Sequence, residues 1–182
     1  MKFIDPRRDP WHALAGDDGP HVSITPRPDM LLDVGQWHAV RAQWPAGVPV
    51  GVRLANDFDV EGIAADLPQI ALVALHFPKW VDGRAYSQAH LLRSRWRFGG
   101  EIRATGEVLV DMLPLLQRTG FDAVALRPDQ SEEVARRALG FFPGHYQGDV
   151  NDPLPLFARP PGTAEALARR PLHEFVSAGE GI

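Results

Sequence analysis

Apolar runs of strand length alternate with segments of helical spacing through the middle of the chain. VPVGVRLA (48–55) and IALVALHF (70–77) are almost continuously apolar, which is typical of strands buried on both faces of a sheet. EIRATG (101–106) and FDAVALR (121–127) also have the length of strands. The segments that follow these runs have apolar residues at helical spacing and predict helices over residues 59–67, 86–96, 108–120 and 131–142.

This alternation gives consecutive strand–helix units between about Val48 and Phe142. Strands that alternate with helices pair in parallel, because each helix carries the chain back to the start of the next strand. We therefore expect an α/β fold with a parallel sheet of about four βα units. Such a sheet is either half of a (β/α)8 barrel or a small open doubly wound sheet, since both forms use the same units.

The N-terminal part of the chain has shorter apolar patterns. HVSITP (21–26) and MLLDV (30–34) predict short strands, and GQWHAVRAQW (35–44) predicts a brief helix. We expect these elements to form a short N-terminal β lobe over residues 1–47.

The chain from residue 143 onward is rich in proline and glycine and predicts an irregular C-terminal arm and tail over residues 143–182, with a short helix at AEALARR (164–170). A chain of 182 residues supports one sizeable core, so we expect a single domain over residues 1–182, built on a βα core at 48–142. A parallel sheet of this size leaves two unpaired edges that a second subunit can cover. We therefore also expect a homo-oligomer.

Composition narrows the chemistry that the chain can perform. It has no cysteine, which excludes disulfides, thiolate catalysis, and iron–sulfur or zinc sites with cysteine ligands. Its 7 histidines are scattered without the spacing of metal ligands. We therefore expect no metal site and no cofactor held by the chain itself.

Charge narrows the choice of partners. The formal net charge is −4, which disfavours nucleic acid and anionic membranes as partners, although residues 84–103 concentrate arginines. Arg93, Arg95 and Arg97 in this cluster fit either a solvated helix face or partners for nearby carboxylates. The N-terminal sequence MKFIDPRRDPW lacks the apolar stretch of a signal peptide, so we expect a cytoplasmic protein.

Parallel α/β sheets bind ligands at the edge where their strands end, here called the carboxyl edge. Asp82, Arg84 and Ser87 follow the second predicted strand, and Gly106 ends the third. An arginine beside free backbone N–H groups at a helix start can hold an anion, so we expect these residues to form an anion-binding site. Asp82 and Asp111 are the candidates for a catalytic acid or base.

Arg103 lies inside the third predicted strand, where alternation places it on the same face as Glu101. A buried guanidinium is costly unless its donors find partners. We therefore expect Arg103 to pair with Asp82, Asp111 or Asp122 and to belong to the ligand-binding site.

The runs LVALHFPKWVDGRAYSQAHLLRSRW and GEIRATGEVLVDMLPLLQRTGFDAVAL, within residues 72–127, closely resemble the bacterial DUF934 family, a domain of unknown function. The positions that match the family's motif are Asp82, Gly83, Arg84, Ser87, Leu92, Arg93, Glu101, Arg103, Gly106, Asp111, Arg118, Gly120, Phe121 and Asp122.

Members of this family are commonly encoded beside the assimilatory sulfite reductase hemoprotein. The resemblance therefore implies a role in the reduction of sulfite for sulfur assimilation. Sulfite reductase needs siroheme, an iron–sulfur cluster and an electron donor, and a chain without cysteine does not ligate such a cluster by thiolate. We expect an accessory protein that binds an anionic ligand or a redox-enzyme partner, such as sulfite reductase, at the carboxyl edge.

The alternative is a small half-barrel enzyme that acts on a phosphorylated or sulfated small molecule, with Asp82 or Asp111 as acid or base and Arg84 as the clamp for an oxyanion. An enclosed pocket around Asp82 and Arg84 would favour the enzyme. A flat and partly apolar patch there would favour the partner protein.

Overall fold

The computed structural model describes residues 1–14, 24–142, 145–160 and 162, and its centre is one parallel sheet of seven strands in the order β1-β7-β6-β5-β4-β3-β2. The strands are β1 (Lys2–Phe3), β2 (His12–Ala13), β3 (Met30–Asp33), β4 (Val50–Leu54), β5 (Ile70–Phe77), β6 (Glu101–Gly106) and β7 (Ala123–Val124). The helices are α1 (Val34–Val40), α2 (Arg84–Ser94), α3 (Leu113–Thr119) and α4 (Glu132–Leu139), together with the 3-10 segments η1 (Arg41–Gln43), η2 (Val60–Gln69), η3 (Val110–Met112) and η4 (Leu156–Ala158).

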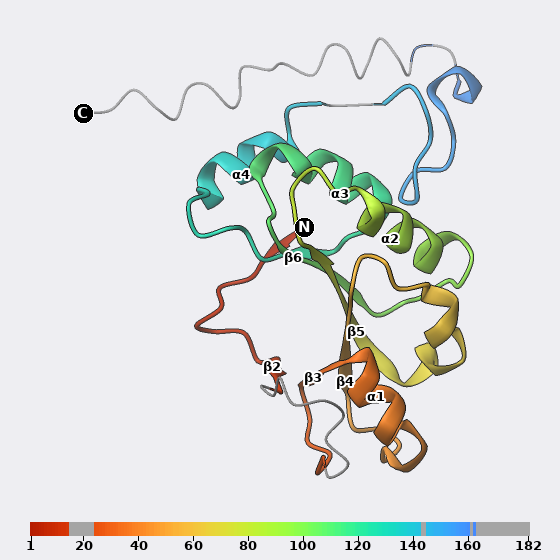
Figure 1. Cartoon of the computed structure of the whole chain (residues 1–182). Helices are drawn as coiled ribbons and strands as arrows, with labels where there is room; N and C mark the ends of the chain where they lie inside the picture. The colour runs from red at the N-terminus through yellow and green to blue at the C-terminus, as the bar shows by residue number, and fades with distance from the viewer. Residues whose placement is uncertain (15–23, 143–144, 161, 163–182) are drawn as a thin grey trace.

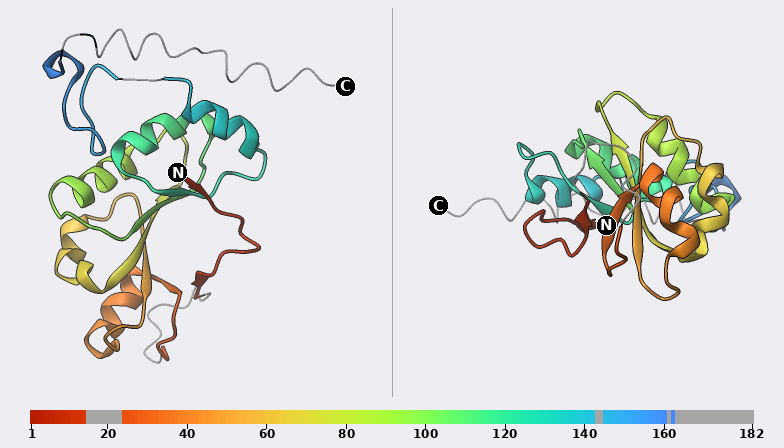
Figure 2. Two further views of the ribbon diagram at one scale, coloured as in Figure 1. Left: turned by 180° about the vertical axis from the view of Figure 1, so that it is seen from behind. Right: turned by 60° about the horizontal axis from the view of Figure 1, so that its bottom comes forward.

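The strand order separates the two forms of sheet that the sequence leaves open. Strands β3 to β7 are neighbours in the order in which they occur along the chain, without the reversal that a doubly wound sheet requires. Neighbouring helices also contact one another, since α2 packs on η2 and α3, and α3 packs on α4. The helices line one side of a curled sheet (Figures 1 and 2). The predicted parallel α/β fold is confirmed, in its half-barrel form.

Local signals in the sequence fix several ends of these elements. Asp59 accepts a hydrogen bond from the backbone at the start of η2, and Ser131 does the same for α4. Gly120 ends α3 in the left-handed conformation with φ 103°. The predicted helix at 59–67 is a 3-10 segment, and the strand expected over 121–127 pairs over two residues only. None of the helices in the described residues is both long and apolar enough to cross a membrane.

The N-terminal residues belong to the same sheet. β1 pairs in parallel with β7, and β2 pairs in parallel with β3, so one short segment supplies both edge strands. We call residues 1–14 the N-terminal strap; Figure 1 shows it, in red, crossing the side of the sheet that faces away from the helices. Of the strand expected over 21–26, residues 24–26 form no strand and the rest lie outside the described residues, as does the helix expected over 164–170.

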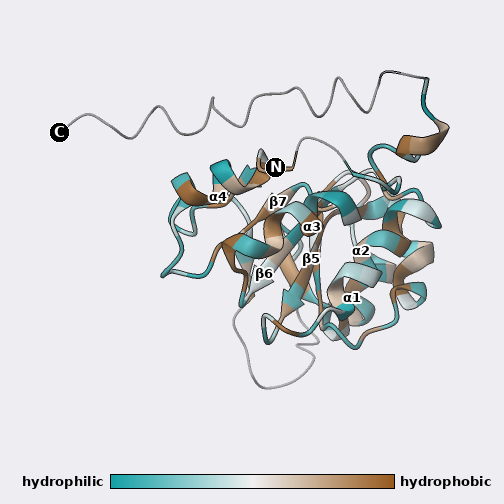
Figure 3. Ribbon diagram, turned by 90° about the horizontal axis from the view of Figure 1, so that it is seen from above, coloured by the Kyte–Doolittle hydropathy of each residue, from teal (hydrophilic) through white to brown (hydrophobic). Residues whose placement is uncertain are grey.

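Alternation along the strands divides the side chains between two layers. Apolar residues on the helix side form the main core, and Figure 3 colours the hydrophobic segments of the strands and helices brown. The other set points to the concave side, under the strap, where Leu72 and Ala74 are fully buried. A Cβ on Gly51 would approach the Trp11 ring to 3.0 Å, so this glycine leaves room for the strap. The strap therefore covers part of the concave side.

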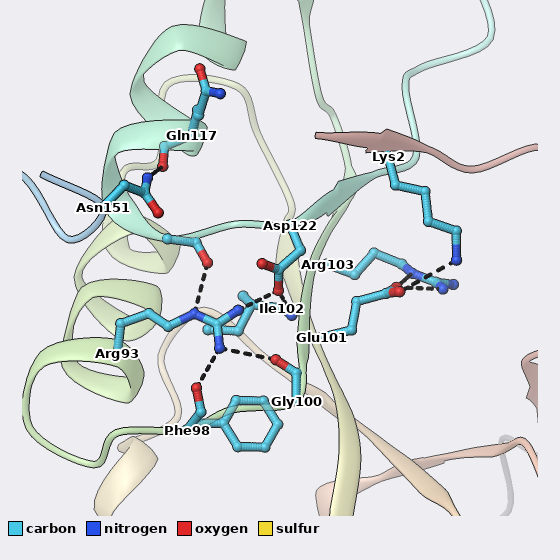
Figure 4. A network of polar contacts seen from close by, with 11 residues as sticks. Lys2, Arg93, Phe98, Gly100, Glu101, Ile102, Arg103, Gln117, Asp122 and Asn151 are labelled. Carbon is cyan, nitrogen blue, oxygen red and sulfur yellow. Dashed lines mark hydrogen bonds and ion pairs between the residues drawn. The ribbon is translucent and has the colours of Figure 1, made fainter.

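Arg103 ties the strap to the sheet. Its side chain is 2% exposed, and its guanidinium contacts Asp9 of the strap at 2.5 Å and Glu101 of its own strand at 2.7 Å. Lys2 adds a contact to Glu101 at 3.4 Å (Figure 4). The expectation that Arg103 is paired is correct, because a guanidinium at this depth needs carboxylate partners.

The partners predicted for Arg103 were wrong. Asp122 bonds Arg93 instead, while Asp82 pairs with Arg84 and Asp111 is exposed. The carboxylate that reaches Arg103 from across the sheet is Asp9, which lies in the strap and which no local pattern links to the third strand.

Replacing Asp9 by asparagine should lower the free energy of unfolding by about 3 kcal/mol, because it leaves a buried guanidinium with one carboxylate partner. Denaturant unfolding followed by circular dichroism measures the change. Asp5→Asn is the matched control, since Asp5 contacts Arg8 at 4.0 Å on the surface and should change stability by less than about 0.5 kcal/mol. Equal stabilities of the two variants would show that the strap is not held by this pair.

Candidate functional site

Two loops meet at the carboxyl edge of the sheet, one after β4 and one after β5. Asn56 in the first loop is buried, and it lies close enough to Asp82 in the second loop to help lower the pKa of that carboxyl. The first loop is fastened from α2, where the buried Gln88 amide donates to the carbonyl oxygens of Ala55 at 2.8 Å and Phe58 at 2.7 Å. The loops therefore form one connected surface.

Asp82 and Arg84 bind each other at this surface. Arg84 Nε donates to one carboxylate oxygen of Asp82 at 3.0 Å and Nη2 donates to the other at 2.7 Å. This bidentate contact, helped by Asn56, holds the pKa of Asp82 well below its usual range and raises the pKa of Arg84. The Arg84 side chain is 56% exposed. A fixed, exposed ion pair follows the end of β5, and its carboxylate stays ionised at neutral pH.

Gly106 ends β6 beside the end of β5, as its register with Phe77 requires. Its φ is +90°, and a Cβ at this position would lie 2.7 Å from Cε1 of His76 and would also collide with the Phe77 carbonyl oxygen. The requirement for glycine comes from this close approach of β5 and the His76 ring. Gly106 lies at the carboxyl edge as expected. The observed contacts explain by packing why this position holds a glycine.

The remaining predicted site residues are spread over the molecule. Ser87 is exposed in the first turn of α2, after Arg84, and Asp111 is exposed in η3. Arg103 lies inside β6 on the concave side, buried under the strap. The structure thus brings Asp82, Arg84 and Ser87 together, and leaves Arg103 with a separate set of partners.

Among Arg93, Arg95 and Arg97, only Arg93 is partly buried. Arg93 donates to the carbonyl oxygens of Phe98, Gly100 and Gly120 and binds the Asp122 carboxylate (Figure 4). It therefore joins the end of α2 to the start of β6 and to the end of α3. Arg95 lies 3.8 Å from Glu61 and stacks over the Trp96 ring. Arg97 is exposed.

A second polar group at the carboxyl edge went unrecognised in the sequence. A hollow of about 170 Å³ is lined by Asp33, Arg53, Leu54, Ala55 and His76. Asp33 and Arg53 are partners in the β3–β4 register, and Arg53 donates to both carboxylate oxygens, at 2.7 and 3.1 Å. This contact raises the pKa of Arg53. The alternation of side chains along a strand could have revealed this group, because it places Arg53 and His76 on the concave face near the ends of their strands.

Ion pairing continues along the edge after β6 and β7. Arg127 donates to Glu107 at 3.0 Å and to Asp129 at 2.6 Å, which raises the pKa of Arg127 and lowers that of Asp129. The carboxyl edge therefore carries paired charges, with acids balancing its arginines. This edge therefore has no large excess of positive charge that would draw anions to it from a distance.

Large apolar side chains stand beside the Asp82–Arg84 pair. Trp80 is 56% exposed and Val81 is 64% exposed, both in the loop after β5. The loop is a tight turn, in which the Asp82 backbone N–H donates to the Lys79 carbonyl oxygen at 3.0 Å. We call Lys79, Trp80, Val81 and Arg84 the edge patch.

A family model described as "Bacterial protein of unknown function (DUF934)" matches residues 51–157, which is more than half of the chain. The chain belongs to the DUF934 family. A comparison with curated proteins found no match. The resemblance seen in the sequence is confirmed.

The DUF934 match begins at β4 and continues through β7, α4 and η4. It includes the edge patch, together with Arg53 and His76 of the hollow. The strap and Asp33 lie before it. In this family member, residues outside the matched range therefore complete both the cover of the concave side and the hollow.

Gly106→Ala should lower the free energy of unfolding by about 1–2 kcal/mol for its left-handed backbone, and by more because its Cβ would collide with the Phe77 carbonyl oxygen. Gly83→Ala is the matched control, because φ is −84° and the nearest atom to a Cβ, in Tyr86, lies at 3.6 Å. That variant should be neutral within about 0.5 kcal/mol. Urea unfolding compares the two; a neutral Gly106→Ala would contradict the packing role.

Proposed function

We propose that the protein is an accessory protein of sulfite reduction that docks onto a redox-enzyme partner through the edge patch. The observation that supports this most directly is the exposure of Trp80 and Val81 beside the fixed Asp82–Arg84 pair. Tryptophan and arginine are the residue types that most often dominate binding energy at protein interfaces. A partly apolar patch at this edge is the arrangement expected of a partner-binding protein.

The geometry of the edge patch suits binding without rearrangement. The Lys79–Asp82 turn fixes the backbone beneath Trp80, and the contact with Asp82 fixes the Arg84 side chain. Groups that are ordered before binding lose less conformational entropy when the complex forms. A partner that covers Trp80 would remove a large apolar area from water, while Lys79 and Arg84 would meet its acidic groups.

The nature of the partner rests on the family and on composition. The resemblance to DUF934 implies a place beside sulfite reductase, whose cofactors carry the electron transfer. A chain without cysteine does not hold an iron–sulfur cluster by thiolate, so it would assist the enzyme from outside. Sulfite reductase, or another enzyme of sulfur assimilation, is therefore the partner that we propose.

The enzyme alternative receives less support from the same residues. A catalytic acid or base works best with a pKa near the working pH, whereas Arg84 holds the pKa of Asp82 well below its usual range. Asp111 lies in η3, after β6, apart from this pair along the edge.

Trp80→Ser and Arg84→Ala should each weaken binding to purified sulfite reductase by at least about tenfold, because each removes an expected interface anchor. Reciprocal pull-downs and titration with the purified enzyme measure the loss. The same variants should fail to restore sulfite-dependent growth in a strain that lacks the gene, while their melting temperatures stay close to that of the parent protein.

Phe142→Ser and Arg95→Ala are the matched controls. Phe142 is an aromatic residue with the same 56% exposure as Trp80, and Arg95 is an exposed arginine directly after α2. Both variants should bind and complement normally. If wild-type protein does not bind the purified enzyme, or if Trp80→Ser and Arg84→Ala bind and complement fully, the docking proposal is wrong.

A further inference from the structure

The hollow between the ends of β3, β4 and β5 lies where parallel half-barrels and barrels bind their ligands, on the concave side at the carboxyl edge. Its volume of about 170 Å³ is below the roughly 300–1,000 Å³ of sites for drug-sized molecules. The hollow therefore suits a ligand of a few non-hydrogen atoms, or one end group of a longer molecule.

Arg53 supplies unused donors to this hollow. A guanidinium carries five N–H groups, and Asp33 takes one from Nε and one from Nη2. Within the described part of the chain, no acceptor is paired with Nη1 of Arg53. The side chain is 44% exposed, so its outer edge faces solvent in the hollow while its inner edge is fixed.

Asp33 acts as a positioning residue for Arg53. Both of its carboxylate oxygens accept from the guanidinium, so its charge is already satisfied when a ligand enters. Its backbone N–H donates to Gln36 Oε1 at 2.9 Å, which anchors it at the start of α1. The Asp33 side chain is itself 45% exposed, so a ligand would bind the guanidinium at the edge that Asp33 leaves free.

His76 closes the hollow from the next strand. Its side chain is exposed, and its ring lies near the backbone of Gly106 and 3.5 Å from the Thr105 hydroxyl. An imidazole can donate one hydrogen bond when neutral and two when protonated. The Thr105 hydroxyl already donates to the Leu75 carbonyl oxygen, so Nδ1 of His76 is the donor in their contact. Arg53 therefore faces the hollow as a donor, His76 adds a second donor when its ring is protonated, and the one carboxylate there is occupied.

We propose that this hollow binds a small oxyanion, either free or as the terminal group of a larger molecule, through Nη1 of Arg53 and the ring of His76. Donors that converge without a free acceptor complement a ligand with several oxygen acceptors on one centre. The site uses none of the edge-patch residues and is independent of docking to a partner.

The full-length protein is titrated with sodium sulfate, inorganic phosphate and methyl phosphate at constant ionic strength, with sodium chloride as the reference. Backbone amide shifts and the His76 ring signals are followed by NMR. We expect saturable shifts that centre on Leu54, Ala55 and His76. Tighter binding of inorganic phosphate indicates a free ion, and tighter binding of methyl phosphate indicates an ester; both support the site.

Arg53→Gln should weaken this binding at least about tenfold, since it removes a charge-assisted hydrogen bond, and His76→Gln should weaken it in the same direction. Arg136→Gln is the matched control, because Arg136 is also an exposed arginine bound to a carboxylate, that of Glu132. Trp80→Ser and Arg84→Gln should also bind the anion normally, which separates this site from the edge patch.

Asp33→Asn/Arg53→Gln removes both charges together, so anion binding can still be tested if the single Arg53 variant does not fold. Binding that is unchanged in a folded Arg53 variant, or the absence of saturable shifts in the wild-type hollow, would overturn the proposal.

Discussion

The buried guanidinium of Arg103 imposes the constraint on which the rest of the fold depends. An arginine inside a sheet must be matched by carboxylates, and Glu101 on the same strand supplies only one of them. The second comes from Asp9, so the N-terminal strap must cross the concave side. Once there, the strap covers Leu72 and Ala74, places Trp11 over Gly51 and provides the edge strands β1 and β2.

The sequence is a good guide where physical causes are local. Apolar runs predicted the four central strands, because burial on both faces leaves a continuous apolar run, and helical spacing predicted α2, α3 and α4. It is a poor guide where the cause is distant. Strand alternation showed that Arg103 needs partners, but the partner Asp9 lies 94 residues away and enters through a strap without a strong strand pattern.

The same distinction separates the two polar regions at the carboxyl edge. Asp82 and Arg84 stand together in one loop, so their proximity could be predicted. Asp33, Arg53 and His76 are scattered along the chain, and only the register of three strands brings them to one hollow. Gly106 seemed to offer a backbone donor to an anion, whereas its geometry follows from the crowding of β5 against β6.

The pairing of β1 with β7 has a consequence for how the chain folds. Lys2 pairs with Ala123, so the earliest strand to be synthesised waits for one of the last before its hydrogen bonds can form. At ribosomal rates of about 5–20 residues per second, this wait lasts on the order of ten seconds. For most of that time Arg103 has not yet been synthesised, and the β1 end of the strap has no strand to pair with. Such long-range closure slows folding, so the strap sets a late step in the maturation of this sheet.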